Sequence, residues 1–279
     1  MIGVSLKNKM TNIVIYTILT LTAIGVLYPV VWVVTGSMNP GDSLFSTRLI
    51  PESLSFKHYI YLFQETNYLI WYKNTLKIAF WNMILSTFLV VTAAYAFSRF
   101  RFPGRKQGLM AMLVLQMFPG FMGMIAIYIL LLQLDLLDNH WGLILVYAGG
   151  SIPFGAWLVK GYFDGLPRSL EEAAKIDGAS HITIFYKIMM PLSKPILVFI
   201  AVNNFIGPWM DFIFARLVLR SGDKKTLAVG LFEMVTGRGN SEFTTFAAGA
   251  VLVAVPITIL FFIFQDQLVD GLKAGANKG

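Results

Sequence analysis

Residues 169–191, with the sequence SLEEAAKIDGASHITIFYKIMMP, form a charged stretch with a helical pattern between two apolar runs. Ser169 followed three residues later by Glu172 has the spacing of a capping box, which predicts a helix start. Gly178 is the residue type that tolerates the left-handed conformation after a helix, and Ser180 can cap a second helix. The stretch therefore predicts two short helices joined by a glycine turn.

The rest of the chain consists largely of apolar runs long enough to cross a bilayer. Hydrophobic residues make up 56% of the 279 residues and charged residues only 13%, about half the roughly 25% typical of soluble domains. This composition excludes an ordinary soluble enzyme and a disordered chain. A membrane helix needs about 20 apolar residues, and the candidate spans are residues 13–34, 78–97, 108–134, 141–159, 195–215 and 243–265. We expect an all-α membrane protein with six transmembrane helices in one domain, residues 1–279, whose first span is an uncleaved helix.

Lysine and arginine in the loops predict the orientation of these spans. The loop at residues 98–107 carries four basic residues and no acid, whereas the next loop carries Asp135 and Asp138 and no base. Since an even number of spans returns the chain to the starting side, we expect both termini, the 98–107 loop and the 161–194 loop to be cytoplasmic. The predicted location is a bacterial inner or plasma membrane, crossed several times. The net charge of +7 then reflects topology and lipid contact, and no basic stripe with aromatics indicates a nucleic-acid partner.

Several classes of function lack the residues that they need. The chain has no cysteine, which excludes disulfides and thiolate metal sites. It has no Walker A pattern, so it cannot bind ATP through a P-loop. Apart from Asp211, the spans carry few ionisable groups, which argues against a proton- or sodium-coupled transporter and against a membrane enzyme. We therefore expect a non-enzymatic membrane protein without a metal site or cofactor of its own.

The fifth apolar run contains polar and aromatic side chains that suit a transport pathway. Asn203 and Asn204 are costly in lipid unless they face a cavity or a partner, and Trp209 offers a ring that can stack on a sugar. Gly207-Pro208 predicts a kink between them. With Gln116 of the third run, Asn203, Asn204 and Trp209 are the candidate pathway residues. Hydrogen bonding between subunits is the equally plausible alternative for these amides.

Two predicted outside loops are long. Residues 37–73 are rich in aromatic side chains, which favours a segment at the lipid headgroups. Residues 219–242 contain two turn sequences around an apolar run at 227–235. The second turn holds the candidate contact for an external partner, although a plain solvated connection remains the alternative: Thr236, Gly237, Arg238, Gly239 and Asn240.

The opening stretch resembles the signature of membrane subunits of binding-protein-dependent ABC importers. That signature is Glu-Ala-Ala, three residues, Gly, nine residues, Ile, one residue, Leu-Pro. The corresponding residues here are Glu172, Ala173, Ala174, Gly178, Ile188, Met190 and Pro191, with Met190 in the place of Leu. The C-terminal residues 271–279 and the residues around 226–230 and 246–248 are similar to the second membrane subunit of maltose/maltodextrin importers.

The resemblance implies the type I ABC importer permease fold and a set of partners. These are a sister permease in a heterodimer, two ATPase subunits that bind ATP and magnesium, and an extracellular solute-binding protein. It further implies that residues 164–191 form a segment that docks on the ATPase, with its contacts at Glu172, Ala173, Ala174, Asp177, Gly178 and Pro191. The tail, residues 269–279, would contact the ATPases through Gly271, Leu272, Lys273, Ala274 and Gly275.

The resemblance also implies an oligosaccharide as the transported substrate. A maltose or maltodextrin is the first expectation, because the similarity to the maltose system extends over nearly the whole chain. A galactooligosaccharide, a raffinose-type sugar and glycerol phosphate remain alternatives, since permeases for these substrates share the same motif. The sequence itself does not distinguish between them.

Overall fold

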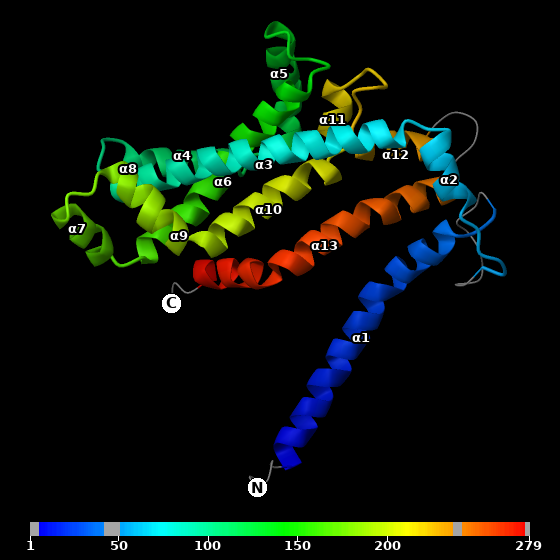
Figure 1. Ribbon diagram of the computed structural model, residues 1–279, viewed down its shortest axis with the longest axis horizontal. Coiled ribbons are helices and arrows are strands. Elements are labelled where there is room, and N and C mark those ends of the chain that lie inside the picture. Colours follow the sequence, from blue (N-terminus) through cyan, green and yellow to red (C-terminus); the bar gives the residue numbers. More distant parts are fainter. Residues whose placement is uncertain (1–5, 42–50, 237–241, 277–279) are drawn as a thin grey trace. The chain divides into compact units, whose positions relative to one another are not determined.

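A computed structural model describes residues 6–41, 51–236 and 242–276, and the side chains among them of residues 9–41, 51–236 and 242–271. Every regular element in those ranges is a helix. The helices (Figure 1) are α1 (Leu6–Ser37), α2 (Lys57–Gln64), α3 (Tyr68–Arg99), α4 (Arg105–Leu115), α5 (Gly120–Gln133), α6 (His140–Gly165), α7 (Ser169–Ile176), α8 (His181–Ile184), the π-helical turn η1 (Phe185–Met189), α9 (Met190–Leu192), α10 (Lys194–Met210), α11 (Ile213–Val218), α12 (Leu227–Thr236) and α13 (Phe243–Ala276).

The chain forms two compact units. The first contains Met1–Thr66 and Leu231–Ala254, and the second contains Asn67–Gly230 and Val255–Gly279. In the first unit α1 is almost entirely exposed apolar surface, as expected of a helix that lies in lipid. The short helix α2 is fixed by polar contacts, because His58, which is 5% exposed, pairs through Nδ1 with the Thr245 hydroxyl at 3.0 Å.

In the second unit, α3, α6 and α10 lie side by side and enclose the core (Figure 1). Buried aliphatic and aromatic side chains from the three helices meet there, among them Val90, Phe163 and Ile200. Gly155 lets α6 approach α3 closely, because a Cβ at that position would lie 2.8 Å from Val90. Such small-residue contacts are the usual way in which helices pack within a membrane.

One of the predicted spans is a broken helix rather than a straight one. The run at 108–134 divides into α4 and α5, which meet at an angle of 101°. Pro119 stands at the N-cap of α5 in an extended conformation and ends the preceding helical path. A second break, of 81°, lies just before the predicted fifth span and separates the α8–α9 stretch from α10 at Ser193.

The predicted fifth span, 195–215, is wrong at its end. Helix α10 ends at Met210, and Asp211 adopts an extended conformation before the separate helix α11. Gly207 and Pro208, the residues of the predicted kink, both lie in the last turn of α10. Helices α3, α6 and α13 extend beyond the runs predicted for them, because polar residues at their ends continue the helix outside the apolar section.

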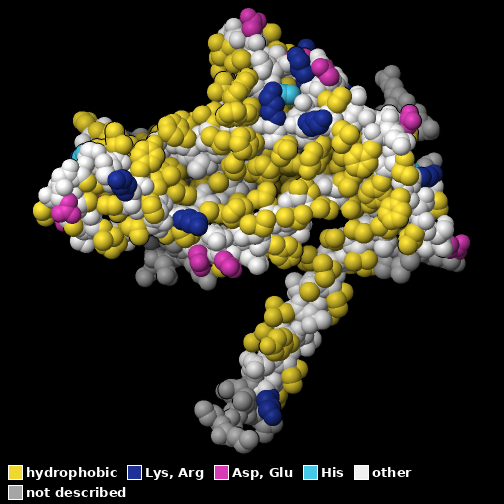
Figure 2. Space-filling view, viewed as in Figure 1, with side chains coloured by type: hydrophobic (Ala, Val, Ile, Leu, Met, Phe, Trp, Pro, Cys, Tyr) yellow, Lys and Arg dark blue, Asp and Glu magenta, His cyan; other side chains and the backbone are white. Residues whose placement is uncertain are grey.

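The helices provide between four and six candidate membrane spans. Four helices in the described part of the chain are long and apolar enough by themselves, and six result if each bent pair is one span. Figure 2 shows apolar side chains over much of the face that α3 and α10 present. Large exposed side chains on α3 include Phe80, Ile84 and Phe88, which is 56% exposed. An apolar face of this extent is suited to contact with lipid or a protein partner.

Candidate functional site

Residues 169–184 form helix α7, a left-handed turn and helix α8. Gly178 has φ +82°, as the predicted glycine turn requires. The Ser180 hydroxyl accepts a hydrogen bond from the Thr183 amide at 3.2 Å, which confirms the predicted cap of α8. The predicted cap of α7 is wrong by one residue, because the N-cap is Arg168 and its side chain makes no capping bond; Ser169 is already helical. The acidic first turn of α7 still favours its N-terminus electrostatically.

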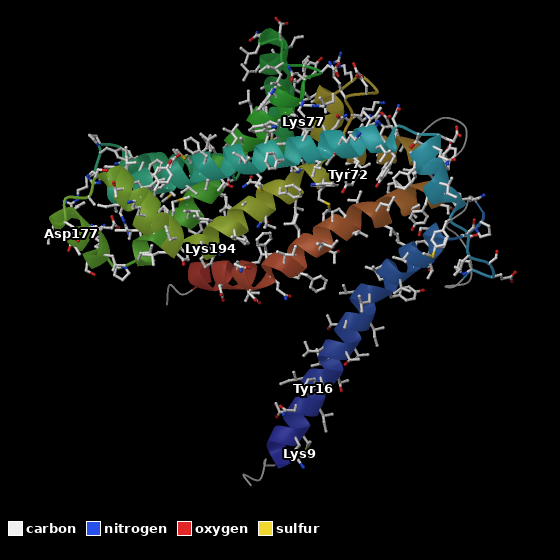
Figure 3. The ribbon with its side chains drawn as sticks, in the orientation of Figure 1. Lys9, Tyr16, Tyr72, Lys77, Asp177 and Lys194 are labelled. Atoms are coloured by element: carbon white, nitrogen blue, oxygen red, sulfur yellow. The ribbon has the colours of Figure 1, made fainter. Side chains whose placement is uncertain are left out.

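Helix α7 presents an exposed surface at one end of the second unit, where Figure 3 labels Asp177. Glu172, Ala173 and Asp177 are exposed, and Pro191 is exposed in α9. Ala174 is half-buried against the apolar core, so the two adjacent alanines face different surroundings. The exposed residues combine a negative charge with a small side chain, which permits close approach by another protein.

Glu171, beside the exposed Glu172, is buried and paired. Its carboxylate accepts a hydrogen bond from Arg99 Nε at 2.5 Å, and the two side chains are 9% and 6% exposed. Arg99 also donates to the Phe163 carbonyl at 2.8 Å and lies 3.9 Å from Asp164. The base of α7 is therefore joined by polar contacts to the ends of α3 and α6. In the sequence Arg99 is one of four bases of the 98–107 loop and indicates only topology, and its tertiary surroundings alone distinguish it.

The four predicted pathway residues do not form one cluster. Asn203 is exposed and its amide donates to the Phe199 carbonyl within α10 at 2.8 Å. Asn204 does the same to Ile200, at 2.9 Å. Gln116 is exposed at the α4–α5 break, and its amide reaches the Gly150 carbonyl of α6 at 3.4 Å.

Trp209 is buried within the second unit, in contrast to the exposed Asn203 and Gln116. It is 4% exposed and its ring meets that of Tyr72 edge-on at 5.3 Å. Among the described residues its Nε1 has no hydrogen-bond partner. In this structure Trp209 therefore packs against α3 and does not face an open surface.

Asn82 of α3 is a buried polar residue that is not among the predicted site residues. It is 3% exposed, and its Nδ2 donates to the Asn204 carbonyl at 2.7 Å. In a regular helix that carbonyl accepts from the amide of residue 208, but Pro208 has no N–H. Membrane helices tolerate proline where a neighbouring helix satisfies the freed carbonyl, so Asn82 supplies the donor that the proline removes. In the sequence, this role is indicated only by the polar Asn82 within the apolar run at 78–97, on a helix other than the one that contains Pro208.

Asp211 also has a structural environment. Its carboxylate accepts hydrogen bonds from the Phe214 and Ala215 amides at 3.1 and 3.2 Å, at the start of α11. The Tyr147 hydroxyl of α6 donates to the same carboxylate. The ionisable group that stands out in the fifth apolar run therefore stabilises the break after α10.

Asp138 organises two loops where α5 and α11 end and α6 begins. Its carboxylate accepts from the Arg220 and Ser221 amides at 2.9 and 3.0 Å and pairs with Lys224 at 3.1 Å. Burial alone raises the pKa of Asp138, but the hydrogen bonds from Ser221, Arg220 and Lys224 outweigh it and hold the pKa well below its usual range. The loop after α5 is thus tied to the loop before α12.

The two remaining sets of predicted contact residues are only partly described. Thr236 is the last residue of α12, the helix that the apolar run at 227–235 forms, but Gly237, Arg238, Gly239 and Asn240 lie outside the described residues. Of the tail, Gly271 is buried where α13 passes α10, since a Cβ there would lie 3.1 Å from the Pro195 carbonyl. Residues 272–276 continue α13 as helix, and 277–279 lie outside the described part.

Comparisons with known proteins agree on one family. The family model described as "Binding-protein-dependent transport system inner membrane component" matches residues 86–274. A galactooligosaccharide transport system permease protein of Bacillus subtilis (strain 168), GanQ, is 45% identical over 267 residues, 95% of this chain and 94% of the relative. The maltodextrin transport system permease protein MdxG of the same strain is 41% identical over 275 residues, 99% of each chain.

A solved structure has a similar fold to this chain. It is a crystal structure of a bacterial ABC transporter involved in the import of the acidic polysaccharide alginate. One of its chains matches with a TM-score of 0.83 and 27% sequence identity, covering 95% of this chain and 99% of that one.

Proposed function

The chain belongs to the family of binding-protein-dependent transport system inner membrane components, and we propose that it is one of two permease subunits of an ATP-driven importer of an oligosaccharide. It is a multi-pass membrane protein of the permease class rather than an enzyme. The observation that carries the proposal is the exposed helix α7 with its glycine turn, at the spacing of the family's motif. In this proposal the chain forms half of the translocation pathway.

Energy enters from a separate ATPase through α7. The exposed Glu172, Ala173 and Asp177 form the docking surface, and two ATPase subunits bind the ATP and magnesium. Closure of the ATPases on ATP displaces α7, closes the inner side of the pathway and opens the outer side. The transition needs no more than a difference in ATP affinity between the two states of the complex.

The proposed topology has six spans with both termini in the cytoplasm. Counting each bent helix pair as one span gives that number, and the four bases at residues 98–107 favour the cytoplasmic side for that loop and for α7. On this topology the loop around residues 236–240, which precedes the last span, is external, and in the proposal it contacts the solute-binding protein. A sister permease covers part of the apolar face of α3 and α10, and the tail after Gly271 contacts the ATPases.

The proposed substrate is a neutral oligosaccharide, with a maltodextrin as the first candidate. The relative named for maltodextrin covers 99% of this chain. A galactooligosaccharide is the second candidate, favoured by the higher identity of 45% to the permease named for that substrate. The exposed amides of Asn203 and Gln116 are the described groups best suited to line a sugar pathway. Titration of the partner solute-binding protein with maltohexaose and with galactotetraose tests the choice, since the proposal requires binding of one of the two.

A charge reversal at the docking surface tests the coupling role. Glu172→Lys changes an exposed residue, so we expect the subunit to insert and assemble while ATP hydrolysis no longer drives uptake. The assay measures sugar uptake and ATP hydrolysis in proteoliposomes that contain the complete complex and its binding protein. Lys77→Glu, an exposed reversal near the other end of α3, is the matched control (Figure 3). Wild-type uptake in Glu172→Lys would contradict the docking role of α7.

A further inference from the structure

The guanidinium of Arg99 contacts residues of several different elements. Besides its bond to Glu171 on α7, it donates to the Phe163 carbonyl of α6 at 2.8 Å and to the Ser98 hydroxyl at 2.8 Å. A weaker contact reaches the Met189 sulfur in η1 at 4.0 Å. One side chain at the end of α3 therefore contacts α6, α7 and the turn that leads to α10.

The surroundings show that this connection is buried and compensated. The Arg99 side chain is 6% exposed, and Asp164 is its second acidic neighbour. Asp164 is itself held by the Ser98 hydroxyl at 2.6 Å and by Lys160. A buried charge is tolerated only where its partners are fixed, so the network favours one geometry between the base of α7 and the helix ends.

Glu171 and Glu172 divide two roles between adjacent residues. Consecutive residues of a helix point about 100° apart, and here Glu172 is exposed on the docking surface while Glu171 is buried against Arg99. A force applied at the exposed side of α7 therefore acts on the ion pair one residue away. Apolar packing also holds this region, for example Ala174 against the core, but such packing can slide, whereas a forked guanidinium with several fixed acceptors resists displacement.

We propose that Arg99, paired with Glu171, is the positioning residue that makes α3 and α6 move with α7 when the ATPase acts on it. The inference rests on the proposed docking role of α7 and adds the side chains through which its displacement enters the membrane helices. Without the pair, α7 follows the ATPase while the membrane helices follow it only in part.

The test separates transmission of movement from simple stability. Arg99→Met leaves Glu171 buried without its cation, which lowers both assembly and coupling. The double variant Arg99→Met with Glu171→Leu removes both charges, a change that commonly leaves a buried site as stable as before. We expect the double variant to assemble in normal amount and to hydrolyse ATP, but to take up about fivefold less sugar per ATP, the lower range of allosteric coupling effects.

Three comparisons make the outcome decisive in proteoliposomes with the complete complex and its binding protein. Arg101→Met removes an exposed base two residues away and keeps normal coupling. Arg99→Lys keeps the charge without the fork, and its uptake per ATP lies between those of the wild type and the double variant. Normal uptake per ATP in the double variant would overturn the inference. Since Glu172→Lys is assayed in the same membranes, failure of the docking role itself is recognised separately.

Discussion

Replacement of Asn82 by leucine tests how the proline in α10 is accommodated. Asn82→Leu keeps a similar side-chain size and removes two hydrogen bonds: the Asn82 Nδ2 bond to the Asn204 carbonyl at 2.7 Å and the Ser86 hydroxyl bond to Asn82 Oδ1 at 2.9 Å. Both Asn82 and Ser86 are buried, at 3% and 0% exposure. Water cannot readily replace either partner, so the loss appears as a loss of stability.

The magnitude follows from the number of bonds and the setting. Side-chain hydrogen bonds between membrane helices contribute about 0.6 kcal/mol on average and up to about 1.7 kcal/mol. The Ser86–Asn82 bond lies within α3; with the same magnitude for that buried bond, loss of the two bonds costs about 1–3 kcal/mol. In a Pro208→Ala background, residue 208 regains an N–H that can donate to the Asn204 carbonyl, so Asn82→Leu should cost less there by about one bond, roughly 0.6–1.7 kcal/mol.

A double-mutant cycle measures this difference. The wild type, both single variants and the double variant are unfolded in mixed micelles of a mild detergent and SDS. Asn203→Leu is the matched control, because its amide donates to Phe199 and does not involve the carbonyl freed by the proline; it should cost the same in both backgrounds. An equal cost of Asn82→Leu in the wild-type and the Pro208→Ala backgrounds would refute the account of Asn82 as the replacement donor.

Two further predictions concern packing and charge in the second unit. Asp138→Gly is compatible with the φ of +53° at that position and removes the carboxylate that ties the two loops, so we expect a loss of about 2–3 kcal/mol at pH 7. Because the folded-state pKa of Asp138 is lowered, the contribution of its carboxylate to stability is present above the ordinary carboxyl pKa of about 4 and is lost as the pH falls further. In thermal unfolding from pH 7 to pH 3, the melting temperatures of the variant and the wild type should therefore converge. Gly230→Ala places a Cβ 2.2 Å from the Trp71 ring and should cost about 1–3 kcal/mol, whereas Gly149→Ala, with nothing within 4 Å, should leave the melting temperature nearly unchanged.

Structural features that depend on neighbouring residues in the sequence could be predicted. Gly178 and Ser180 determine their turn and cap through their own backbone and hydroxyl, and both predictions are confirmed. The apolar runs also predicted helices correctly, because composition alone places a chain segment in lipid. The spans predicted from apolar runs alone omit the break near Pro119, although a proline within such a run is a usual place for a helix to end or bend.

The parts that depend on distant residues could not be predicted in the same way. Arg99 has the same sequence pattern as its exposed neighbour Arg101, and only the approach of Glu171 distinguishes it. The sequence predicts that Trp209 lines a pathway, and it does not reveal that the ring of Tyr72 on α3 packs against it. In a membrane protein, apolar residues face both the core and the lipid, so hydrophobicity does not reveal which side chains are buried.

Site-specific cross-linking tests the central claim, that α7 docks on an ATPase, most directly. Because the chain contains no cysteine, Ala173→Cys on the exposed surface of α7 provides a single attachment point for a photoreactive cross-linker, and Lys77→Cys on α3 is the control. In membranes that contain the whole complex, we expect a cross-link from residue 173 to the ATPase subunit, and its yield should change when ATP is bound. We expect no cross-link to the ATPase from residue 77. A cross-link to the ATPase from residue 77, or none from residue 173 in an active complex, would contradict it.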